Sequence, residues 1–424
     1  MKNRFIILFF IINLAVCFTG CSNNSTKVKN LSELIEIDSN ISANIIKFDD
    51  NDYYVGISEN STKINLQGDT ASVDGSGVIV SGSTIKINSS GSYVISGTLS
   101  DGSILVDVGE DENVNIILNN ANIKCLTGSP IYVNRANKVI ISLAGGSSNT
   151  ISDTSNYNSD TEATAAIYSK NNLTINGLGE LTIDANYNNA IQSKDILNIV
   201  GGTININSVN DGIIGKNMIQ ILNGNINITS GGDGIKATND TDSVLGYVAV
   251  RGGNINIVAD ADGIQAETSL IIDGGKFSIT AGGGSDAESS SSNYNFEKQD
   301  SKDTEDIDSL KGLKAKGSIL ITSGEFNINS LDDSIHSNNS IIIKNGDFEI
   351  SSGNDGIHAD TAISVEDGRI NISKSYEGIE SSSIMISGGE IDIISLDDGI
   401  NIVGGKDGSS INVRESLTND IYSD

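Results

Sequence analysis

The chain has 424 residues, with 26 lysines and arginines against 55 aspartates and glutamates, and so a formal net charge of −29 at pH 7. Nucleic-acid binding depends on cations that neutralise phosphates, so this charge argues strongly against a nucleic-acid partner. The chain contains no tryptophan. This excludes a flat tryptophan platform for crystalline cellulose, although tyrosine could do part of that work.

The first residues have the pattern of an export signal. Lys2 and Arg4 form a positively charged start, and residues 5–16 form an apolar run that is short for a membrane span. The following Phe18-Thr19-Gly20-Cys21 resembles a bacterial lipoprotein box. We therefore expect a signal peptide over residues 1–20 and lipidation of Cys21. The alternative is ordinary signal cleavage nearby.

A lipidated Cys21 would make the protein an extracellular lipoprotein of the cell membrane, with residues 21–50 as a tether and the lipid as its membrane contact. Cys17 would leave with the signal peptide, and Cys125 would then be the remaining free cysteine. Neither an intrachain disulfide nor a cysteine metal cluster can form in such a chain. We expect Cys125 to be a small core residue.

A repeat of about 22 residues dominates the rest of the chain. Its anchor is an apolar residue that follows a glycine or another small residue, and successive anchors lie 24, 22, 22, 29, 49, 22, 22, 22 and 21 residues apart. We interpret the step of 49 as two repeats plus an insert, residues 283–309, which is acidic, serine-rich and expected to be disordered. The anchors are Ile167, Ile191, Ile213, Ile235, Ile264, Leu313, Ile335, Ile357, Ile379 and Ile400.

Each repeat contains short runs in which apolar residues alternate with polar ones, separated by glycine, aspartate and asparagine. Period two indicates strands, and the small residues indicate turns. Three short strands fit in one repeat, whereas no segment has helical periodicity of useful length. The sequence thus predicts an all-β, single-domain, three-faced parallel β-helix over residues 51–415, with a tail at 416–424. Residues 409–424 are expected to fold over the edge of the last coil.

An acidic residue precedes most anchors. Coiling places these acids on one edge, about 4.8 Å apart, where two bare carboxylates repel by about 3 kcal/mol at an effective dielectric of about 20. Ca²⁺, which prefers several oxygen ligands, would relieve the repulsion. The alternative is turn chemistry, in which Asp bonds its own backbone and the next glycine takes a positive φ. The candidate Ca²⁺ ligands are Asp211, Asp233, Asp262, Asp333, Asp355, Glu377, Asp397 and Asp398.

The residue after each anchor should point outward if the anchor points inward. Most of these residues carry hydrogen-bonding side chains, which predicts a polar shelf for an extended glycan; the alternative is an ordinary exposed sheet face. His336 and His358 should be stacked neighbours that bind a transition metal or a sugar, or form a plain ladder. The candidate carbohydrate-binding residues are Gln192, Lys236, Gln265, Lys314, His336, His358, Glu380 and Asn401. Tyrosines expected in loops, where a ring could stack on a sugar, are Tyr157, Tyr187, Tyr247, Tyr294 and Tyr376.

Two stretches carry a family resemblance: INLQGDTASVDGSGVIVSGSTIKINSSGSYVISGTLSDGSILVDV, at 64–108, and NVNIILNNANIKCLTGSPIYVNRANKVIISLAGGSSNTISD, at 113–153. They resemble the bacterial carbohydrate-binding β-helix family, whose members are similar to polysaccharide lyases in fold. The resemblance covers about residues 60–405. It implies a right-handed parallel β-helix that binds Ca²⁺ and plant cell-wall polysaccharide, cellulose and pectic polygalacturonate. Relatives tend to continue with further coils, so the resemblance does not carry over to this chain any site that those coils build.

Three functions remain open. The first is a surface-anchored, non-catalytic glycan binder, expected to be a monomer, in which Ca²⁺ bridges an acidic protein to an acidic polysaccharide. The second is an enzyme: a pectate-lyase-like β-elimination needs a base and a cation, with Lys236, Lys314 and Arg251 as candidate bases, while a pectin hydrolase needs clustered aspartates. The third is a structural surface protein or adhesin with protein partners.

Overall fold

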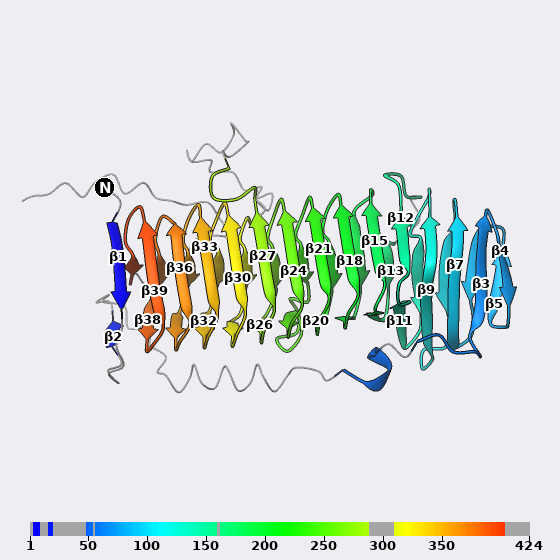
Figure 1. Ribbon diagram of the computed structural model, residues 1–424, viewed down its shortest axis with the longest axis horizontal. Helices are drawn as coiled ribbons and strands as arrows, with labels where there is room; N and C mark the ends of the chain where they lie inside the picture. The colour runs from blue at the N-terminus through cyan, green and yellow to red at the C-terminus, as the bar shows by residue number, and fades with distance from the viewer. Residues whose placement is uncertain are drawn as a thin grey trace, which may run out of the picture.

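The structure, a computed structural model, describes residues 3–8, 16–19, 48–53, 56–158, 162–287 and 309–402. It is a long solenoid whose parallel strands lie side by side on three faces (Figure 1). Within these ranges the helical content is one 3-10 turn, η1, Asp50–Asp52, and no described helix has the length and apolar character to cross a membrane. The predicted three-faced parallel β-helix is confirmed.

The first face is a 14-stranded sheet whose central strands are only three residues long. It is formed by β5 Val78–Ser81, β6 Thr84–Ile87, β8 Ser103–Asp107, β10 Ile131–Arg135, β13 Ala165–Ser169, β16 Asn189–Ser193, β19 Ile213–Gly215, β22 Ile235–Ala237, β25 Ile264–Ala266, β28 Leu313–Ala315, β31 Ile335–Ser337, β34 Ile357–Ala359, β37 Ile379–Ser381 and β40 Ile400–Asn401.

The other two faces join through the early strands into one 26-stranded sheet. The second face is formed by β11 Lys138–Leu143, β14 Asn172–Gly177, β17 Ile196–Ile199, β20 Met218–Ile221, β23 Tyr247–Val250, β26 Leu270–Ile272, β29 Ile319–Ile321, β32 Ser340–Ile343, β35 Ala362–Val365 and β38 Ser383–Ile386. The third face is formed by β12 Ser148–Ser152, β15 Glu180–Ala185, β18 Thr203–Ser208, β21 Asn225–Ser230, β24 Asn254–Ala259, β27 Lys276–Ala281, β30 Glu325–Ser330, β33 Asp347–Ser352, β36 Arg369–Lys374 and β39 Glu390–Ser395.

Antiparallel strands lie at both ends of the solenoid. At one end β3, Thr62–Gly68, pairs antiparallel with β4, Ala71–Asp74, and parallel with β7, Gly91–Leu99. The long strand β9, Asn113–Lys124, follows β7 and pairs with both β11 and β12, which joins the second and third faces. At the other end β1, Asn3–Leu8, and β2, Val16–Thr19, pair antiparallel with β39 and β38.

The edge of the last coil is therefore paired with N-terminal strands in this structure. Residues 409–424, which the sequence suggested for that role, lie outside the described residues, as do Cys21 and nearly all of the expected tether. If residues 1–20 are removed as a signal peptide, β1 and β2 go with them.

One interpretation of the repeat is wrong. Ile264 of β25 pairs directly with Leu313 of β28, so the step of 49 is one coil that carries a long insert, not two coils. Most of the predicted insert, 288–308, lies outside the described residues. The anchors are otherwise in unbroken register: for example, Ile335 of β31 pairs with Ile357 of β34.

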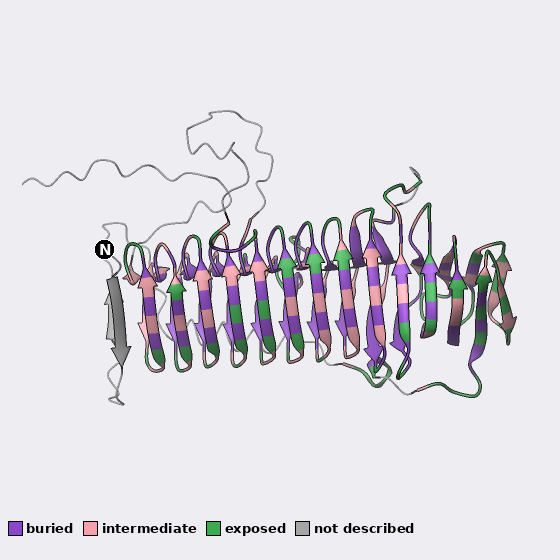
Figure 2. Ribbon diagram, turned by 45° about the horizontal axis from the view of Figure 1, so that its top comes forward, coloured by how far each residue is buried: buried purple, intermediate pink, exposed green. Residues whose placement is uncertain are grey.

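The core is a continuous stack of isoleucine, leucine and valine side chains, one layer per coil. Along the strands of the third face, buried and exposed residues alternate, as period two requires (Figure 2). Three phenylalanines replace isoleucine in this stack: Phe326 lies between Phe277 and Phe348, with ring centroids 4.9 and 4.5 Å away. The predicted role of Cys125 is confirmed, since its side chain is free of disulfide and buried.

Candidate carbohydrate-binding face

The outward residues of the first face form one ladder, as predicted. Tyr132 pairs with Tyr168, and Tyr168 pairs with Gln192. The pairing continues coil by coil through the predicted residues to Glu380 and Asn401. This register is a consequence of the anchor spacing, because each anchor and its follower move together from coil to coil.

The prediction of an exposed shelf is wrong for half of this ladder. Gln192, Gln265, His336 and His358 are buried, and His336 is fully so. Lys236, Lys314, Glu380 and Asn401 are intermediate. For Gln265, His336 and His358 the cause is the shortness of the strands: a side chain in the middle of a three-residue strand has coil neighbours above and below and the acidic edge beside it. It therefore packs against that edge instead of standing free.

The acids that precede the anchors bond the backbone of the next coil. The Oδ1 atom of Asp211 accepts a hydrogen bond from the Asp233 N–H at 2.8 Å, and that of Asp233 accepts one from the Asp262 N–H at 2.9 Å. The same bond runs from the Asp355 N–H to Asp333 at 3.0 Å. The predicted bond from each aspartate to the backbone of its own turn is replaced here by a bond to the backbone of the next coil.

Other bonds of this series carry it through the remaining coils. Asp262 Oδ1 accepts a hydrogen bond from the N–H of Lys311 at 2.8 Å. Lys311 stands at the repeat position where most other coils have an acidic residue. Asp355 Oδ1 accepts from the N–H of Glu377 at 3.2 Å. Each such bond satisfies a buried backbone donor, which is the role of an obligatory partner in a packed interior.

The glycine after each acid serves close approach between coils. A Cβ atom on Gly234 would lie 2.6 Å from the carbonyl oxygen of Gly263, and one on Gly263 would lie 2.5 Å from that of Gly312. Neither glycine is among those with positive φ, so the predicted positive φ at this position is wrong. In the recurring Asp-Gly, the aspartate therefore bonds the backbone of the next coil, and the glycine allows the two coils to approach closely.

The second carboxylate oxygens face the ladder, so the two predicted lines form one network. Asp233 Oδ2 pairs with Lys236 Nζ at 2.6 Å, and Asp262 Oδ2 pairs with Lys314 Nζ of the next coil at 3.2 Å. Each of these two aspartates thus has a lysine beside it. Burial and the neighbouring Asp262 still raise the pKa of Asp233 to about 6.

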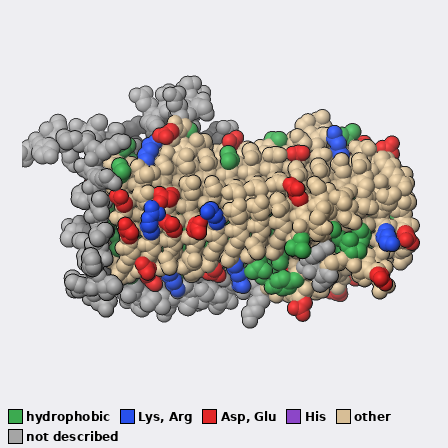
Figure 3. Space-filling view, viewed as in Figure 1, with side chains coloured by type: hydrophobic (Ala, Val, Ile, Leu, Met, Phe, Trp, Pro, Cys, Tyr) green, Lys and Arg blue, Asp and Glu red, His purple; other side chains and the backbone are tan. Residues whose placement is uncertain are grey.

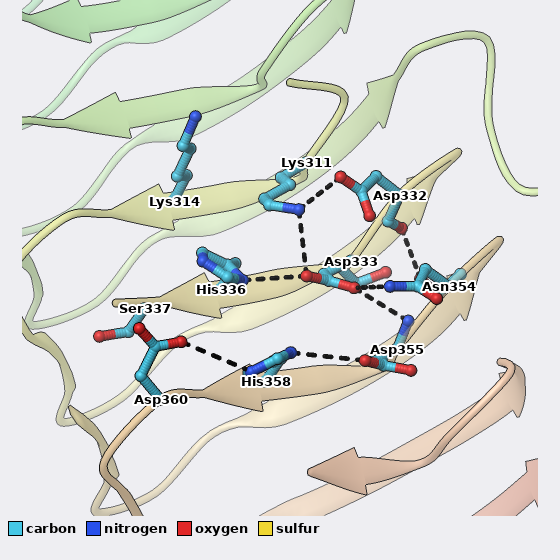
Figure 4. A network of polar contacts seen from close by, with 12 residues as sticks. Lys311, Lys314, Asp332, Asp333, His336, Ser337, Asn354, Asp355, His358 and Asp360 are labelled. Atoms are coloured by element: carbon cyan, nitrogen blue, oxygen red, sulfur yellow. Dashed lines mark hydrogen bonds and ion pairs between the residues drawn. The ribbon is translucent and has the colours of Figure 1, made fainter. Parts of the chain in front are cut away.

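A buried lysine neutralises the centre of this network (Figure 4). The Nζ atom of Lys311 contacts Asp332 and lies 3.1 Å from Asp333 Oδ2, while His336 Nδ1 lies 2.9 Å from the same oxygen. Burial alone would raise the pKa of Asp333, but Lys311 and His336 hold it well below its usual range. Burial and the charge of Asp333 raise the pKa of Asp332.

The next coil has more negative charge than positive. His358 Nδ1 lies 3.4 Å from Asp355 Oδ2, and its Nε2 lies 3.7 Å from Asp360 Oδ1 (Figure 4). Burial raises the pKa of Asp355 to about 6. Burial and a hydrogen bond with Glu377 raise the pKa of Glu380 to about 9.

An aromatic site that the sequence reasoning missed lies at the other end of the ladder. The rings of Tyr132 and Tyr168 stack with centroids 5.6 Å apart, and the amino groups of Lys170 and Lys194 lie 5.8 and 5.9 Å from those of Tyr132 and Tyr168 respectively. A cavity of about 290 Å³ adjoins Tyr132. Its lining consists of Ser103, Leu105, Cys125, Thr127, Gly128, Ser129, Tyr132 and Ala163. Tyr132 is one coil before Tyr168 in the repeat, and extending the ladder by that coil would have found it.

The expected loop tyrosines are only partly placed as predicted. Tyr157 and Tyr187 lie outside strands and stack on each other at 4.0 Å, and burial raises the pKa of the Tyr157 hydroxyl beside Asp153. Tyr247 is wrong as a loop residue, because it begins β23 and is buried. Tyr294 lies outside the described residues.

The third face offers a second polar surface. Asn227 Nδ2 donates to Asn205 Oδ1 at 2.8 Å, and Asn256 Nδ2 donates to Asn227 Oδ1 at the same distance. Seen from this side, much of the molecule is uncharged, and charged side chains gather towards the C-terminal coils (Figure 3). Such an amide row presents hydrogen-bonding groups without net charge.

A family model described as carbohydrate-binding domain-containing protein matches residues 81–356, which include the Tyr132 cavity and most of the ladder. The chain belongs to this family. A carbohydrate-binding domain-containing protein of Acetivibrio thermocellus is 38% identical over 151 residues, which are 34% of this chain and 53% of the relative. The chain thus spans about half the length of that relative.

The fold has a solved counterpart. The structure of the polysaccharide lyase-like protein from C. thermocellum, a gadolinium derivative, is 38% identical with a TM-score of 0.52, over 53% of this chain and 92% of that chain. The family model and this solved structure thus both indicate a carbohydrate-binding, lyase-like family.

Proposed function

We propose that this carbohydrate-binding family member is a calcium-dependent, non-catalytic binder of plant cell-wall polysaccharide, anchored at the cell surface through a lipid on Cys21. The observation that carries the proposal is the cavity beside Tyr132, with its aromatic wall, hydroxyl groups and neighbouring lysines. Among the candidate polymers it favours the acidic one, pectic polygalacturonate.

The cavity has the size and chemistry of a sugar subsite. Its volume of about 290 Å³ is near the lower end of the range for ligand pockets, roughly 300–1,000 Å³. Ser103 and Thr127 bring hydroxyls that can exchange hydrogen bonds with sugar hydroxyls, whereas the buried Ser129 hydroxyl already donates to the Ala165 carbonyl. The ring of Tyr132 adds an apolar surface for the sugar carbons.

The adjacent lysines favour a carboxylate on the sugar. Lys194 is exposed, and the exposed Glu162 pairs with Lys170 and accepts a hydrogen bond from the Tyr132 hydroxyl at 2.9 Å. An exposed ion pair of this kind contributes little to stability. A uronate carboxylate can therefore take the place of Glu162 beside Lys170 at small cost.

Calcium fits only part of the predicted ligand set. Asp233, Asp262 and Asp333 already face lysine or histidine, which disfavours a cation beside them. Asp397 and Asp398 are exposed, and within the described ranges neither is paired with a lysine or histidine. We place the proposed Ca²⁺ at these two carboxylates, where it would bridge to an acidic polysaccharide.

A lyase is the weaker candidate because of its bases. Lys236 and Lys314 are held in ion pairs with buried aspartates. Although burial lowers it, the pKa of Lys236 is raised overall by Asp233 and Asp211, so the amine stays protonated and is a poor base. The third candidate base, Arg251, has its guanidinium 5.9 Å from the ring of Phe48, a contact that favours the charged form over the neutral form that a base needs.

The test is retention of the chain without residues 1–21 on polygalacturonate and on cellulose, with Ca²⁺ and with excess chelator. Tyr132→Ala should weaken binding to polygalacturonate by about tenfold, or about 1.4 kcal/mol. Asn227→Ala, on the third face, is the matched control and should leave it unchanged.

Other outcomes would change the proposal. Release of unsaturated uronate products would make the protein a lyase. Retention on cellulose that is lost in Asn227→Ala but kept in Tyr132→Ala would move the site to the third face. No retention on either polymer would favour the hypothesis of a structural surface protein or adhesin. The anchor is tested separately: Cys21→Ala should move the full-length chain from the membrane fraction to the medium.

A further inference from the structure

A cluster of metal-ligating side chains lies near the C-terminal end of the first face, many coils away from the Tyr132 cavity. It consists of Asp355, His358 and Glu380, whose ligand atoms all lie within 4.8 Å of one another. His358 and Glu380 are paired neighbours on β34 and β37, and Asp355 precedes β34 by two residues. The coil register thus holds His358 and Glu380 together, and Asp355 lies in the turn that leads into β34.

The distances within this cluster match those between ligands of one ion. His358 Nδ1 is 3.4 Å from Asp355 Oδ2, which is long for a hydrogen bond. Any two ligand atoms of a tetrahedral ion with bonds of about 2.0–2.1 Å are about 3.3 Å apart. An ion between these two atoms would therefore need little movement of either side chain.

The second ring nitrogen of His358 has a suitable partner. Its Nε2 atom points towards Asp360, with 3.7 Å between Nε2 and Oδ1 (Figure 4). A metal-bound histidine commonly donates its other N–H to a carboxylate, which orients the ring and raises its basicity. In this site His358 would bind the ion through Nδ1, on the side of Asp355, and donate its Nε2–H to Asp360.

The neighbouring histidine shows why the site is here and not one coil earlier. His336 also lies beside an aspartate, Asp333, but Lys311 Nζ is 3.1 Å from the same oxygen and supplies a positive charge. No lysine within the described ranges pairs with Asp355 or Glu380. The ligand atoms of Asp355 and Glu380 lie within 4.8 Å of each other, and a bound cation would offset the repulsion between the two carboxylates.

We propose that Asp355, His358 and Glu380 bind a divalent transition metal of the zinc type, with Asp360 orienting the histidine. An imidazole ligand distinguishes this site from a calcium site, because Ca²⁺ takes oxygen ligands whereas imidazole suits Zn²⁺, Co²⁺ and related ions. The site does not rest on polysaccharide binding, and it lies one coil before the Ca²⁺ proposed at Asp397 and Asp398.

The test is titration of the chelator-treated, full-length protein with Zn²⁺ by calorimetry and with Co²⁺ by absorption spectroscopy. One ion per chain should bind, with the intense visible bands of four-coordinate Co²⁺, and a large excess of Ca²⁺ should leave those bands in place. His358→Gln and Glu380→Gln should abolish the bands. Asp360→Asn should weaken Zn²⁺ binding by about tenfold, as expected for an orienting partner.

His336→Gln is the matched control and should keep both stoichiometry and spectrum, and thermal melts establish that each variant is folded. Glu380 lies at the partly exposed end of the cluster, so Glu380→Gln keeps the test informative if His358→Gln does not fold. Absence of Zn²⁺ and Co²⁺ uptake, uptake unaffected by either ligand substitution, or displacement of Co²⁺ by Ca²⁺ would each overturn the proposal. None of these results depends on whether the chain binds a polysaccharide.

Discussion

Replacement of Asp233 by asparagine should stabilise the protein at neutral pH. Asp233 is 4% exposed, and its Oδ1 accepts the Asp262 N–H at 2.9 Å. Asparagine keeps an oxygen for this bond and removes a charge that burial and Asp262 disfavour. Lys236, whose side chain is 30% exposed, can turn to solvent when its partner is lost.

The magnitude follows from the pKa of Asp233, which is about 6 in the fold against an ordinary value of 3.8. Because the folded-state pKa is the higher one, this group's contribution to stability is complete below pH 3.8 and is lost as pH rises through about 6. At about 1.4 kcal/mol per pKa unit, the loss approaches about 3 kcal/mol at high pH. Asparagine should thus stabilise by about 3 kcal/mol at pH 8, by about half as much at pH 5 and by little at pH 4.

The assay is urea unfolding of the chain without residues 1–21, followed by far-ultraviolet circular dichroism in chelator from pH 4 to pH 8. Asp260→Asn, at an exposed position, is the control and should change the free energy of unfolding by less than about 0.5 kcal/mol. Asp233→Ala should do worse than asparagine by about 1–3 kcal/mol, because it leaves the Asp262 N–H without its acceptor. If Asp233→Asn destabilises at pH 8, or if its effect does not shrink as pH falls, the account of this carboxylate is wrong.

Two further substitutions test the packing of the solenoid. Lys311→Met should lower the free energy of unfolding by about 3–5 kcal/mol at pH 7, because it leaves the buried Asp333 and its neighbour Asp332 without their lysine. Combining it with Asp333→Asn should recover part of the loss. A loss below about 1 kcal/mol in the single variant would refute the ion-pair argument. Phe326→Ala should cost about 3–5 kcal/mol, because it opens a cavity between two stacked rings, whereas Phe326→Leu should cost much less; equal costs in urea unfolding would show that the ring stack is unimportant.

Much of this architecture could be derived from the repeat. Anchors at intervals of 22 residues required one core slot per coil, and Ile335 pairing with Ile357 is a direct result. The same spacing put His336 beside His358 and Lys236 beside Gln265, since a follower must stack wherever its anchor stacks. The repeat length and the alternation of apolar and polar residues are local properties of the chain, so they can be recognised without a structure.

The roles of the side chains on that lattice depended on contacts between coils. Sequence order could not show that the Oδ1 of Asp211 meets the N–H of Asp233, or that a Cβ on Gly234 would strike the carbonyl of Gly263. It also could not show that three-residue strands leave His336 fully buried, because exposure depends on what neighbouring coils cover. The sequence by itself thus determined the coil, its register and the groups on each ladder, through a hydrophobic period. Only the tertiary structure decided which of those groups face one another across a coil boundary, because hydrogen bonds and charge pairs depend on distances of a few ångströms that a period does not specify.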